Sequence, residues 1–344
     1  MNKPSPGGGK LGRKLVDGMV GMTRDRTAQL CLDNARASVS SLDRGQSLAA
    51  LREETLGEGE SAIVIAAGPS IRRHDPIKAI KAASYKGAII ATESAILYCL
   101  RNGVVPDLVV TVDPFPMRIV RWFGDPNLTR EVLEGDDYYR RQDMDESFAN
   151  EIRTNQEVMD LVDRHAKDMR IALSASSSQP VVQRVLQTAM KVYWWNPMLD
   201  DAEEPDSLTR QLYRLNQLPC VNAGGNVGAA CWMMASAVLG KRRVALTGID
   251  FAYYADTPYQ ATQYYYEAVE LVGEDNLDSI YTWIHNPYTD SWFYTDPAYL
   301  WYREAFLEMA ADADCETYNC TEGGILFGNN VGFVGLDEFL TMHA

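Results

Sequence analysis

The stretch Ser61-Ala62-Ile63-Val64-Ile65-Ala66-Ala67-Gly68-Pro69-Ser70-Ile71 decides the fold. A short run of apolar residues that ends in turn residues is typical of a strand buried on both faces, as strands of parallel sheets are. Gly68 permits close approach of the backbone, Pro69 suits the first turn of a helix, and Ser70 can cap that turn. We therefore predict a buried strand that passes through a tight turn into a helix.

The beginning of this helix is a candidate site for an anion. Backbone N–H groups at a helix N-terminus lack intrahelical partners, and the helix dipole also favours negative charge. The sequence thus predicts that Gly68, Pro69 and Ser70 bind a phosphate group of a nucleotide. An ordinary tight turn between a strand and a helix is the alternative interpretation of the same residues.

The rest of the chain alternates apolar strand patterns with helical patterns. Further strands are predicted in the ranges 87–91, 107–114, 169–173, 191–195, 243–251 and 315–319. Strands that are separated by helices imply βαβ units. We therefore predict an α/β fold, with a doubly wound, mainly parallel, Rossmann-like sheet flanked by helices.

The distribution of charge and glycine divides the chain into three parts. The first 44 residues contain eight Lys or Arg residues and four Asp residues, although the whole chain has a formal net charge of -15. We predict that residues 1–58 form a basic N-terminal arm, either flexible or a loosely docked helix. Residues 59–330 are predicted to form a nucleotide-binding α/β domain, and residues 331–344 a C-terminal tail.

The composition argues against two classes of partner. A strongly acidic chain is a poor binder of nucleic acid, which needs a basic surface. No apolar run approaches the length of a membrane span, and the six cysteines contain no C-x-x-C pair. We expect a soluble, cytoplasmic protein with buried free thiols. The sequence does not specify its oligomeric state.

Polar residues follow several of the predicted strands, where ligands bind in open α/β sheets. Asp113 and Asp250 are the main catalytic candidates, because a carboxylate at such a position could act as a base, contact a ribose hydroxyl or hold Mg²⁺. Asp113 is a metal ligand only if the reaction is a diphosphate transfer. Each of the two could instead cap a helix or close a turn. Glu93, Thr321 and Glu322 are candidates for nucleotide binding on the same grounds.

His285 is the one histidine predicted to lie near a site, within an aromatic loop, and packing is the alternative role for it. The many tyrosines could line a sugar or base pocket or serve only as packing. The sequence contains no Walker A, G-x-G-x-x-G, H-E-x-x-H or G-x-S-x-G motif. P-loop kinases, common dehydrogenases, zincins and α/β-hydrolases are therefore not indicated.

Five ordered motifs between about residues 61 and 328 resemble one known family. They are Ile65 to Ile71, Pro106-Asp107 with Asp113-Pro114, Gly225-Asn226-Val227, Leu246 to Phe251, and Asn319 to Gly324. The chain resembles the MptE-like and motility-associated factor (Maf) proteins. That family includes archaeal 6-hydroxymethylpterin diphosphokinases and bacterial flagellin glycosyltransferases, and the latter are similar in fold to bacterial sialyltransferases.

The resemblance implies that Gly225, Asn226, Gly248 and Asp250 complete a nucleotide pocket with the Gly68 turn. The sialyltransferase-like members have a histidine base before their last helix, but the corresponding stretch 291–296 contains none. Only His285, a few residues upstream, could substitute.

Three functions follow from these observations. The first is a glycosyltransferase that takes a sugar from a nucleotide-activated donor, with a CMP-sugar favoured, to a hydroxyl on a protein or glycan acceptor. The second is the transfer of diphosphate from ATP, with Mg²⁺, to 6-hydroxymethyl-dihydropterin. The third is a nucleotide-binding module without catalysis.

Overall fold

A parallel sheet forms the centre of the molecule. The computed structural model describes residues 8–115, 120–135, 152–328 and 330–343. Within these residues ten strands make one sheet in the order β1-β6-β5-β4-β3-β2-β8-β12-β13, with β7 beside β6, and all pairings between these strands are parallel. The strands are β1 Gln46–Ser47, β2 Ser61–Ile65, β3 Ala88–Thr92, β4 Leu108–Val110, β5 Arg170–Ser174, β6 Lys191–Pro197, β7 Cys220–Val221, β8 Arg243–Thr247, β12 Glu316–Asn319 and β13 Val331–Phe333. The predicted α/β fold with a mainly parallel sheet is confirmed.

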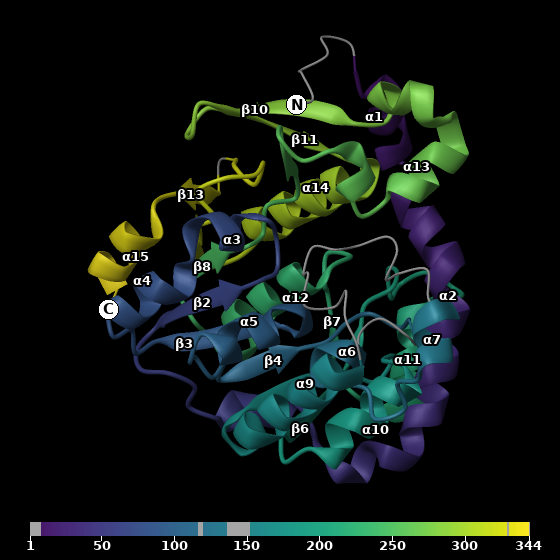
Figure 1. Ribbon diagram of the computed structural model, residues 1–344. Helices are drawn as coiled ribbons and strands as arrows, with labels where there is room; N and C mark the ends of the chain where they lie inside the picture. Colours follow the sequence, from purple (N-terminus) through teal and green to yellow (C-terminus); the bar gives the residue numbers. More distant parts are fainter. Residues whose placement is uncertain (1–7, 116–119, 136–151, 329, 344) are drawn as a thin grey trace.

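Helices cover both faces of this sheet (Figure 1). The helices of the described residues are α1 Lys10–Val16, α2 Met19–Ser38, α3 Ser70–His74, α4 Pro76–Ala82, α5 Ile96–Arg101, α6 Val120–Phe123, α7 Arg130–Gly135, α9 Ile152–His165, α10 Gln179–Gln187, α11 Leu208–Asn216, α12 Val227–Met233, α13 Tyr265–Val272, α14 Pro297–Ala311 and α15 Leu336–His343. Of these, α1 and α13 pack beside the second sheet described below. Alternate residues of β2 face opposite layers: Ala62 and Val64 pack with α12, whereas Ile63 and Ile65 pack with α4 and α15. This two-sided burial explains the uninterrupted apolar pattern of β2.

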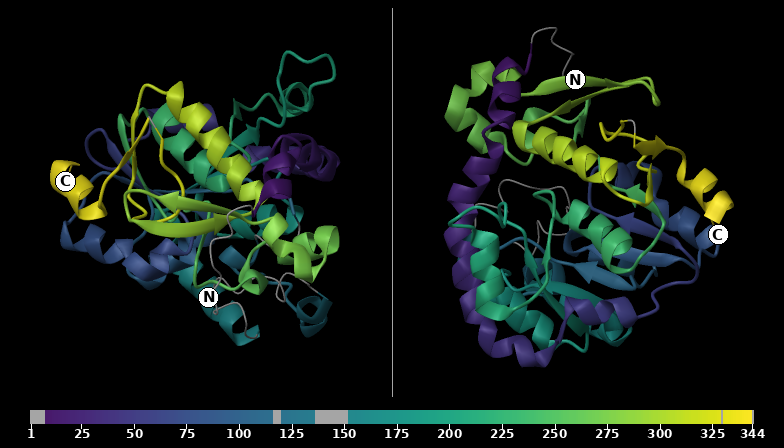
Figure 2. Two further views of the ribbon diagram at one scale, coloured as in Figure 1. Left: turned by 90° about the horizontal axis from the view of Figure 1, so that it is seen from above. Right: turned by 180° about the vertical axis from the view of Figure 1, so that it is seen from behind.

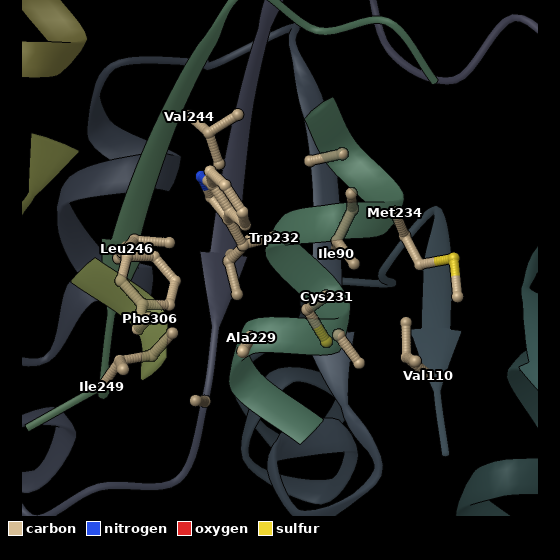
Figure 3. Close-up of a cluster of buried hydrophobic side chains, with 14 of the residues drawn as sticks. Ile90, Val110, Ala229, Cys231, Trp232, Met234, Val244, Leu246, Ile249 and Phe306 are labelled. Atoms are coloured by element: carbon tan, nitrogen blue, oxygen red, sulfur yellow. The ribbon is translucent and has the colours of Figure 1, made fainter. Parts of the chain in front are cut away.

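The largest core lies between the sheet and α12. Trp232 is fully buried there, and its ring centroid lies 5.0 Å from that of Phe306 on α14. Its indole Nε1 donates to the hydroxyl of Thr317 on β12 at 2.9 Å. Figure 3 shows side chains of β3, β4 and β8 around this helix. The core thus fixes α12 over the middle of the sheet and thereby places the turn that precedes it.

The order in which strands are added to the sheet changes direction at β2. From β2 the strands run outward to β6, and the chain then returns to add β8 on the other side of β2. Ligands of open α/β sheets bind at the carboxyl ends of the strands where the order reverses in this way. The strand order therefore predicts a ligand site at the carboxyl ends of β2 and β8.

A second, antiparallel sheet lies beside the central one. It contains β9 Tyr253–Tyr254, β10 Thr282–Asn286 and β11 Ser291–Thr295 in the order β10-β11-β9. Its buried aromatic residues pack with α13 in a cluster of their own. Trp283, Phe293 and Tyr294 of these strands are buried, whereas Trp292 is exposed.

The first 58 residues contact the domain at several points. α2 runs along one side of the molecule and contacts α10, α11 and α14 (Figures 1 and 2). The Asn34 side-chain amide donates to the carbonyl oxygens of Pro114 and Ser176 at 2.8 and 2.9 Å. Strand β1 pairs with β6. Residues 1–7 lie outside the described residues.

The segment predicted as a C-terminal tail supplies two elements. Strand β13 extends the central sheet next to β12, and α15 packs against α4. Leu336, Phe339 and Leu340 are buried in that contact. None of the helices in the described residues combines the length and the apolar character that crossing a bilayer requires.

Candidate functional site

A cavity of about 1220 Å³ lies at the carboxyl ends of the central strands. Its floor is made by the turns that follow β2, β3, β4 and β8 and by the turn that begins α12, and its walls come from α2, α13 and α14. Cavities of about 300–1,000 Å³ enclose most small ligands. This cavity is therefore large enough for a nucleotide-activated donor together with an acceptor group.

The turn after β2 reaches the cavity, but its amide groups are used within the protein. The Gly68 N–H donates to the Gly248 carbonyl at 2.9 Å. The Ser70 N–H and hydroxyl both donate to Oδ2 of Asp250, at 3.4 and 2.7 Å. A Cβ on Gly68 would lie 2.2 Å from that same Oδ2. Glycine here permits the ends of β2 and β8 to pack closely, and the N–H groups of Gly68 and Ser70 are not available to a phosphate.

Asp250 lies on the floor of the cavity, directly after β8. Only 2% of the residue is exposed, and its Oδ1 has no hydrogen-bond partner while Oδ2 is held by Ser70. Burial raises the pKa of Asp250 to about 7, against the opposing effect of the Ser70 hydrogen bonds and the charge of Arg73. The next residue, Phe251, has a φ of +50°. A bulky residue in the left-handed region is strained, and such strain gathers at functional sites.

Glu93 is the second buried carboxyl group of the cavity. It follows β3 and is 3% exposed, and its Oε2 has no hydrogen-bond partner. Burial raises its pKa to about 8, and the negative charge of Asp113 adds to this increase. Glu93 is therefore mostly a neutral carboxylic acid at pH 7. In that form it can donate one hydrogen bond and accept others.

Asp113 lines the cavity after β4 and also closes its own turn. Its Oδ1 accepts the Phe115 N–H at 2.8 Å, which is the turn role that the sequence left open. Its negative charge contributes to the raised pKa values of Glu93, Cys31 and Tyr302, in each case after the effect of burial. The negative charge of Asp113 therefore acts on three groups that line the cavity.

The turn before α12 also lines the cavity. Asn226 caps the helix, because its Oδ1 accepts the Ala229 N–H at 2.9 Å. Gly225 has a φ of +77°, and a Cβ there would lie 2.6 Å from the ring of Trp301. These glycine and asparagine residues are therefore explained by the turn itself and by its packing against α14.

Two predicted nucleotide-binding residues lie away from the large cavity. Thr321 and Glu322 line a separate cavity of about 140 Å³. The Thr321 hydroxyl bonds within its own turn, to Asn319. A carboxylate oxygen of Glu322 accepts the Leu336 N–H at 3.1 Å and so caps α15. Both residues have structural partners, and neither lines the large cavity, although Ser70 and Gly248 also line the small one.

His285 is also outside the large cavity. It lies on β10, its Nε2 is 3.1 Å from Oδ1 of Asp290, and its ring centroid lies 5.2 Å from that of Trp292. The side chain is 38% exposed on the hairpin. The structure thus assigns it the surface contacts of a hairpin and does not place it where a base would act on a ligand held by Asp250.

Sequence reasoning missed the contribution of α2 to the cavity. Thr23, Arg24, Arg26 and Thr27 all lie on its wall. The excess of basic residues in the first 44 positions was visible in the sequence. However, the weak amphipathic pattern of this segment gave no reason to predict that the helix packs against the domain. Three tyrosines line the cavity, Tyr264 just before α13 and Tyr299 and Tyr302 on α14. The sequence offered a pocket role for the tyrosines only as one of two alternatives.

The described residues contain no group of three or more His, Cys, Asp or Glu side chains arranged to hold a metal ion. Mg²⁺ is commonly held by one or two carboxylates together with the phosphates of a substrate. Of the predicted ligands, Asp113 suits that arrangement better than Asp250, because a metal ligand must be ionised and burial keeps Asp250 partly protonated at pH 7.

Comparisons with known proteins add two findings. The model of the family described as "6-hydroxymethylpterin diphosphokinase MptE-like" matches residues 34–123, from the end of α2 to α6, and the predicted MptE-like resemblance is confirmed over that segment. The solved structure of MAf glycosyltransferase from Magnetospirillum magneticum AMB-1 is similar, with a TM-score of 0.48 and 14% sequence identity. That similarity covers 89% of this chain and 38% of the other, so this chain spans well under half of that protein's length. The comparison with curated proteins gave no match.

Proposed function

We propose that this chain, which is MptE-like over residues 34–123, is a transferase that binds a nucleotide-activated donor in the cavity at β2 and β8 and passes a sugar to a hydroxyl acceptor. The observation that carries the proposal is the pair of buried carboxyl groups, Glu93 and Asp250, each with one oxygen that has no partner. Buried polar atoms are rarely left without partners, because each costs on the order of 1–3 kcal/mol. A ligand that forms hydrogen bonds with these two oxygens explains why the protein keeps them buried without partners of its own.

Asp250 is suited to move a proton at neutral pH. A general base works best when its pKa is near the operating pH, and burial brings the pKa of Asp250 to about 7. Ser70 holds Oδ2, so Oδ1 is the oxygen that can accept the proton of an acceptor hydroxyl. The acceptor oxygen then forms its bond to the anomeric carbon of the sugar. The bond from that carbon to the phosphate oxygen breaks, and the nucleotide leaves with the electron pair.

Glu93 is assigned to binding. A neutral carboxylic acid that is desolvated and faces a cavity can both donate to and accept from one ligand group. It therefore discriminates in favour of a ligand with an adjacent donor and acceptor, such as the edge of a heterocyclic base or a pair of sugar hydroxyls. Its neutrality also lowers the electrostatic cost of bringing an anionic donor into an acidic cavity.

Diphosphate transfer is the second candidate, and the family match over residues 34–123 favours it. In this reaction the hydroxyl of a pterin alcohol attacks the β-phosphorus of ATP, and AMP leaves. Bound Mg²⁺ would neutralise charge on the phosphates, and Asp113 would be the residue of this chain that holds it. The proton of the alcohol would again pass to Asp250. Asp250 is the base in both candidates, so its raised pKa does not distinguish between them.

A panel of ligands tests the proposal. CMP-sugars, UDP-sugars and ATP with Mg²⁺ are each added to the protein, with and without 6-hydroxymethyl-dihydropterin, while thermal unfolding and nucleotide release are followed. Release of CMP or UDP supports glycosyl transfer. Production of AMP that requires both Mg²⁺ and the pterin supports diphosphate transfer. Binding without release supports a non-catalytic module, and no binding by any compound contradicts the assignment of the cavity.

A further inference from the structure

The helix α2 brings positive charge to an otherwise acidic cavity. Nine Asp or Glu residues line the cavity, whereas Arg24 and Arg26 are its only Lys or Arg side chains among the described residues. An anionic ligand is repelled by the ionised members of such a set unless a cation stands near it. The turn at Gly68 does not supply this compensation, because its N–H groups at Gly68 and Ser70 are bonded within the protein.

The three arginines of α2 have different surroundings. Arg36 has its Nη1 2.6 Å from Oδ1 of Asp33, and Arg24 has its Nη2 4.0 Å from Oδ2 of Asp200. Arg26 has no carboxylate within that distance in the described part of the chain. Its guanidinium carbon lies instead 5.3 Å from the centroid of the Phe115 ring, in the loop that follows β4.

One contact and one charge effect place Arg26 at the cavity. Phe115, in the same loop as Asp113, provides the aromatic face on which the guanidinium rests. Across the cavity, burial raises the pKa of Tyr302 on α14, and the positive charge of Arg26 acts against that increase. The N–H groups of Arg26 are therefore near the cavity yet not committed to an acidic side chain.

We propose that Arg26 binds the phosphate group of the donor, so that the N-terminal helix is part of the donor site. The inference rests on the proposed function, which places a nucleotide-activated donor in this cavity. A guanidinium offers a planar fork of donors that matches two phosphate oxygens, and stacking on an aromatic ring holds that plane. Arg26 lies before residue 34 and hence outside the MptE-like segment. The donor site would thus combine that segment with a residue that precedes it.

The docking of α2 supports this role. Asn34 joins the helix to the loops that follow β4 and β5, through the carbonyls of Pro114 and Ser176. Pro114 adjoins both Asp113 and Phe115, so one loop holds the helix, contacts the guanidinium and presents a carboxylate to the cavity. Arg24 also lines the cavity, but its guanidinium lies 4.0 Å from a carboxylate oxygen of Asp200, so it is not equivalent to Arg26.

Binding measurements on three arginine variants test the proposal. CMP, UDP and ATP are titrated into the wild-type protein and into R26Q, R24Q and R36Q, and cytidine, uridine and adenosine serve as probes without phosphate. We expect R26Q to weaken binding of the preferred nucleotide roughly 10- to 100-fold, the usual loss for a hydrogen bond to a charged group. Binding of the matching nucleoside stays unchanged, and the salt dependence of nucleotide binding decreases. R24Q has a smaller effect.

R36Q is the matched control, because it removes the same group from the same helix at an exposed position paired with Asp33. Thermal unfolding of each variant shows whether the helix remains docked. If R26Q binds the nucleotide as tightly as R36Q does, Arg26 is not the phosphate ligand, although the proposed function stands. If R26Q weakens nucleoside and nucleotide equally, the effect is one of cavity shape, and the proposal is wrong. If the wild-type protein binds none of the nucleotides, both proposals fail.

Discussion

The carboxyl groups at the two edges of the central sheet are in opposite states. At the amino edge, Glu54 accepts hydrogen bonds from Lys191, from the Tyr193 hydroxyl at 2.6 Å and from Arg170 at 3.0 Å. The hydrogen bonds from Lys191 and Tyr193, helped by Arg170, lower the pKa of Glu54 to about 2 despite partial burial. At the carboxyl edge, Glu93 and Asp250 are more deeply buried and each keeps one oxygen without a partner.

This difference distinguishes Glu54, whose role is structural, from Glu93 and Asp250, which are suited to bind a ligand. The donors around Glu54 come from β5 and β6, and they bond to both of its carboxylate oxygens. In the part of the chain that the structure describes, no donor reaches the Oε2 of Glu93. A protein that keeps a desolvated carboxyl group without partners accepts a cost to its stability, and such costs occur at functional sites.

The largest expected effect is on catalysis by D250N. Asparagine keeps the shape of the side chain and still accepts the Ser70 hydrogen bond, but it cannot take a proton. We expect turnover of the donor found by the ligand panel to fall roughly 100- to 10,000-fold, while the free energy of unfolding changes by less than about 1 kcal/mol. Nucleotide release and urea unfolding measure the two quantities. D314N, an exposed position after α14, is the control. If D250N is active but less stable than wild type, the role of Asp250 is structural, like that of Glu54.

The pH dependence of stability should have opposite signs at the two edges. The pKa of Glu93 is raised from 4.5 to about 8, so between these values the unfolded chain releases a proton that the folded protein keeps. The free energy of unfolding therefore decreases as pH rises, by up to about 1.4 kcal/mol per pH unit for this group. The pKa of Glu54 is lowered from 4.5 to about 2, so its contribution is present above pH 4.5 and is lost as pH falls toward 2.

Glutamine variants separate these contributions, because glutamine does not titrate. E93Q should flatten the stability curve between pH 4.5 and 8 and make the protein more stable than wild type at pH 8. Asp250 still titrates in E93Q and leaves part of the slope. E54Q should flatten the curve only below pH 4.5, and it should destabilise the protein at pH 7 by about 1–2 kcal/mol. Urea unfolding over this pH range gives both curves. Parallel curves for E93Q and wild type would mean that Glu93 titrates normally in the folded protein.

Much of the fold and part of the site followed from the sequence. The apolar stretch before Gly68 predicted the central strand, and the alternation of strands and helices predicted the parallel sheet, because both are local patterns. Asp113, Glu93 and Asp250 were placed in one cavity by the general position of ligands at strand ends. The engagement of Ser70 by Asp250 could not be predicted, since it joins residues 180 positions apart.

The residues that the sequence misplaced share a physical reason. Thr321 and Glu322 follow a strand as Asp250 does, yet they bond to their own turn and to α15. Polar residues at strand ends serve as caps as often as ligands, and only the neighbouring elements decide between the two. Arg26 is the converse case: it lies on a helix whose apolar pattern is weak, and its contact with Phe115 depends on the tertiary docking of α2.

The smallest expected effect concerns His285, which separates the resemblance from the geometry. The resemblance offers His285 as a base, whereas the structure places it on the β10 and β11 hairpin beside Asp290. Because the pair is exposed, its loss should cost less than about 1 kcal/mol. We expect H285A to change turnover less than about twofold, which corresponds to a change of less than about 0.5 kcal/mol in the activation free energy. D290N removes the partner while it keeps the imidazole, and it should behave in the same way. An H285A defect as large as that of D250N, with D290N unaffected, would show that the imidazole itself takes the proton, and Asp250 would then have to be reassigned to binding.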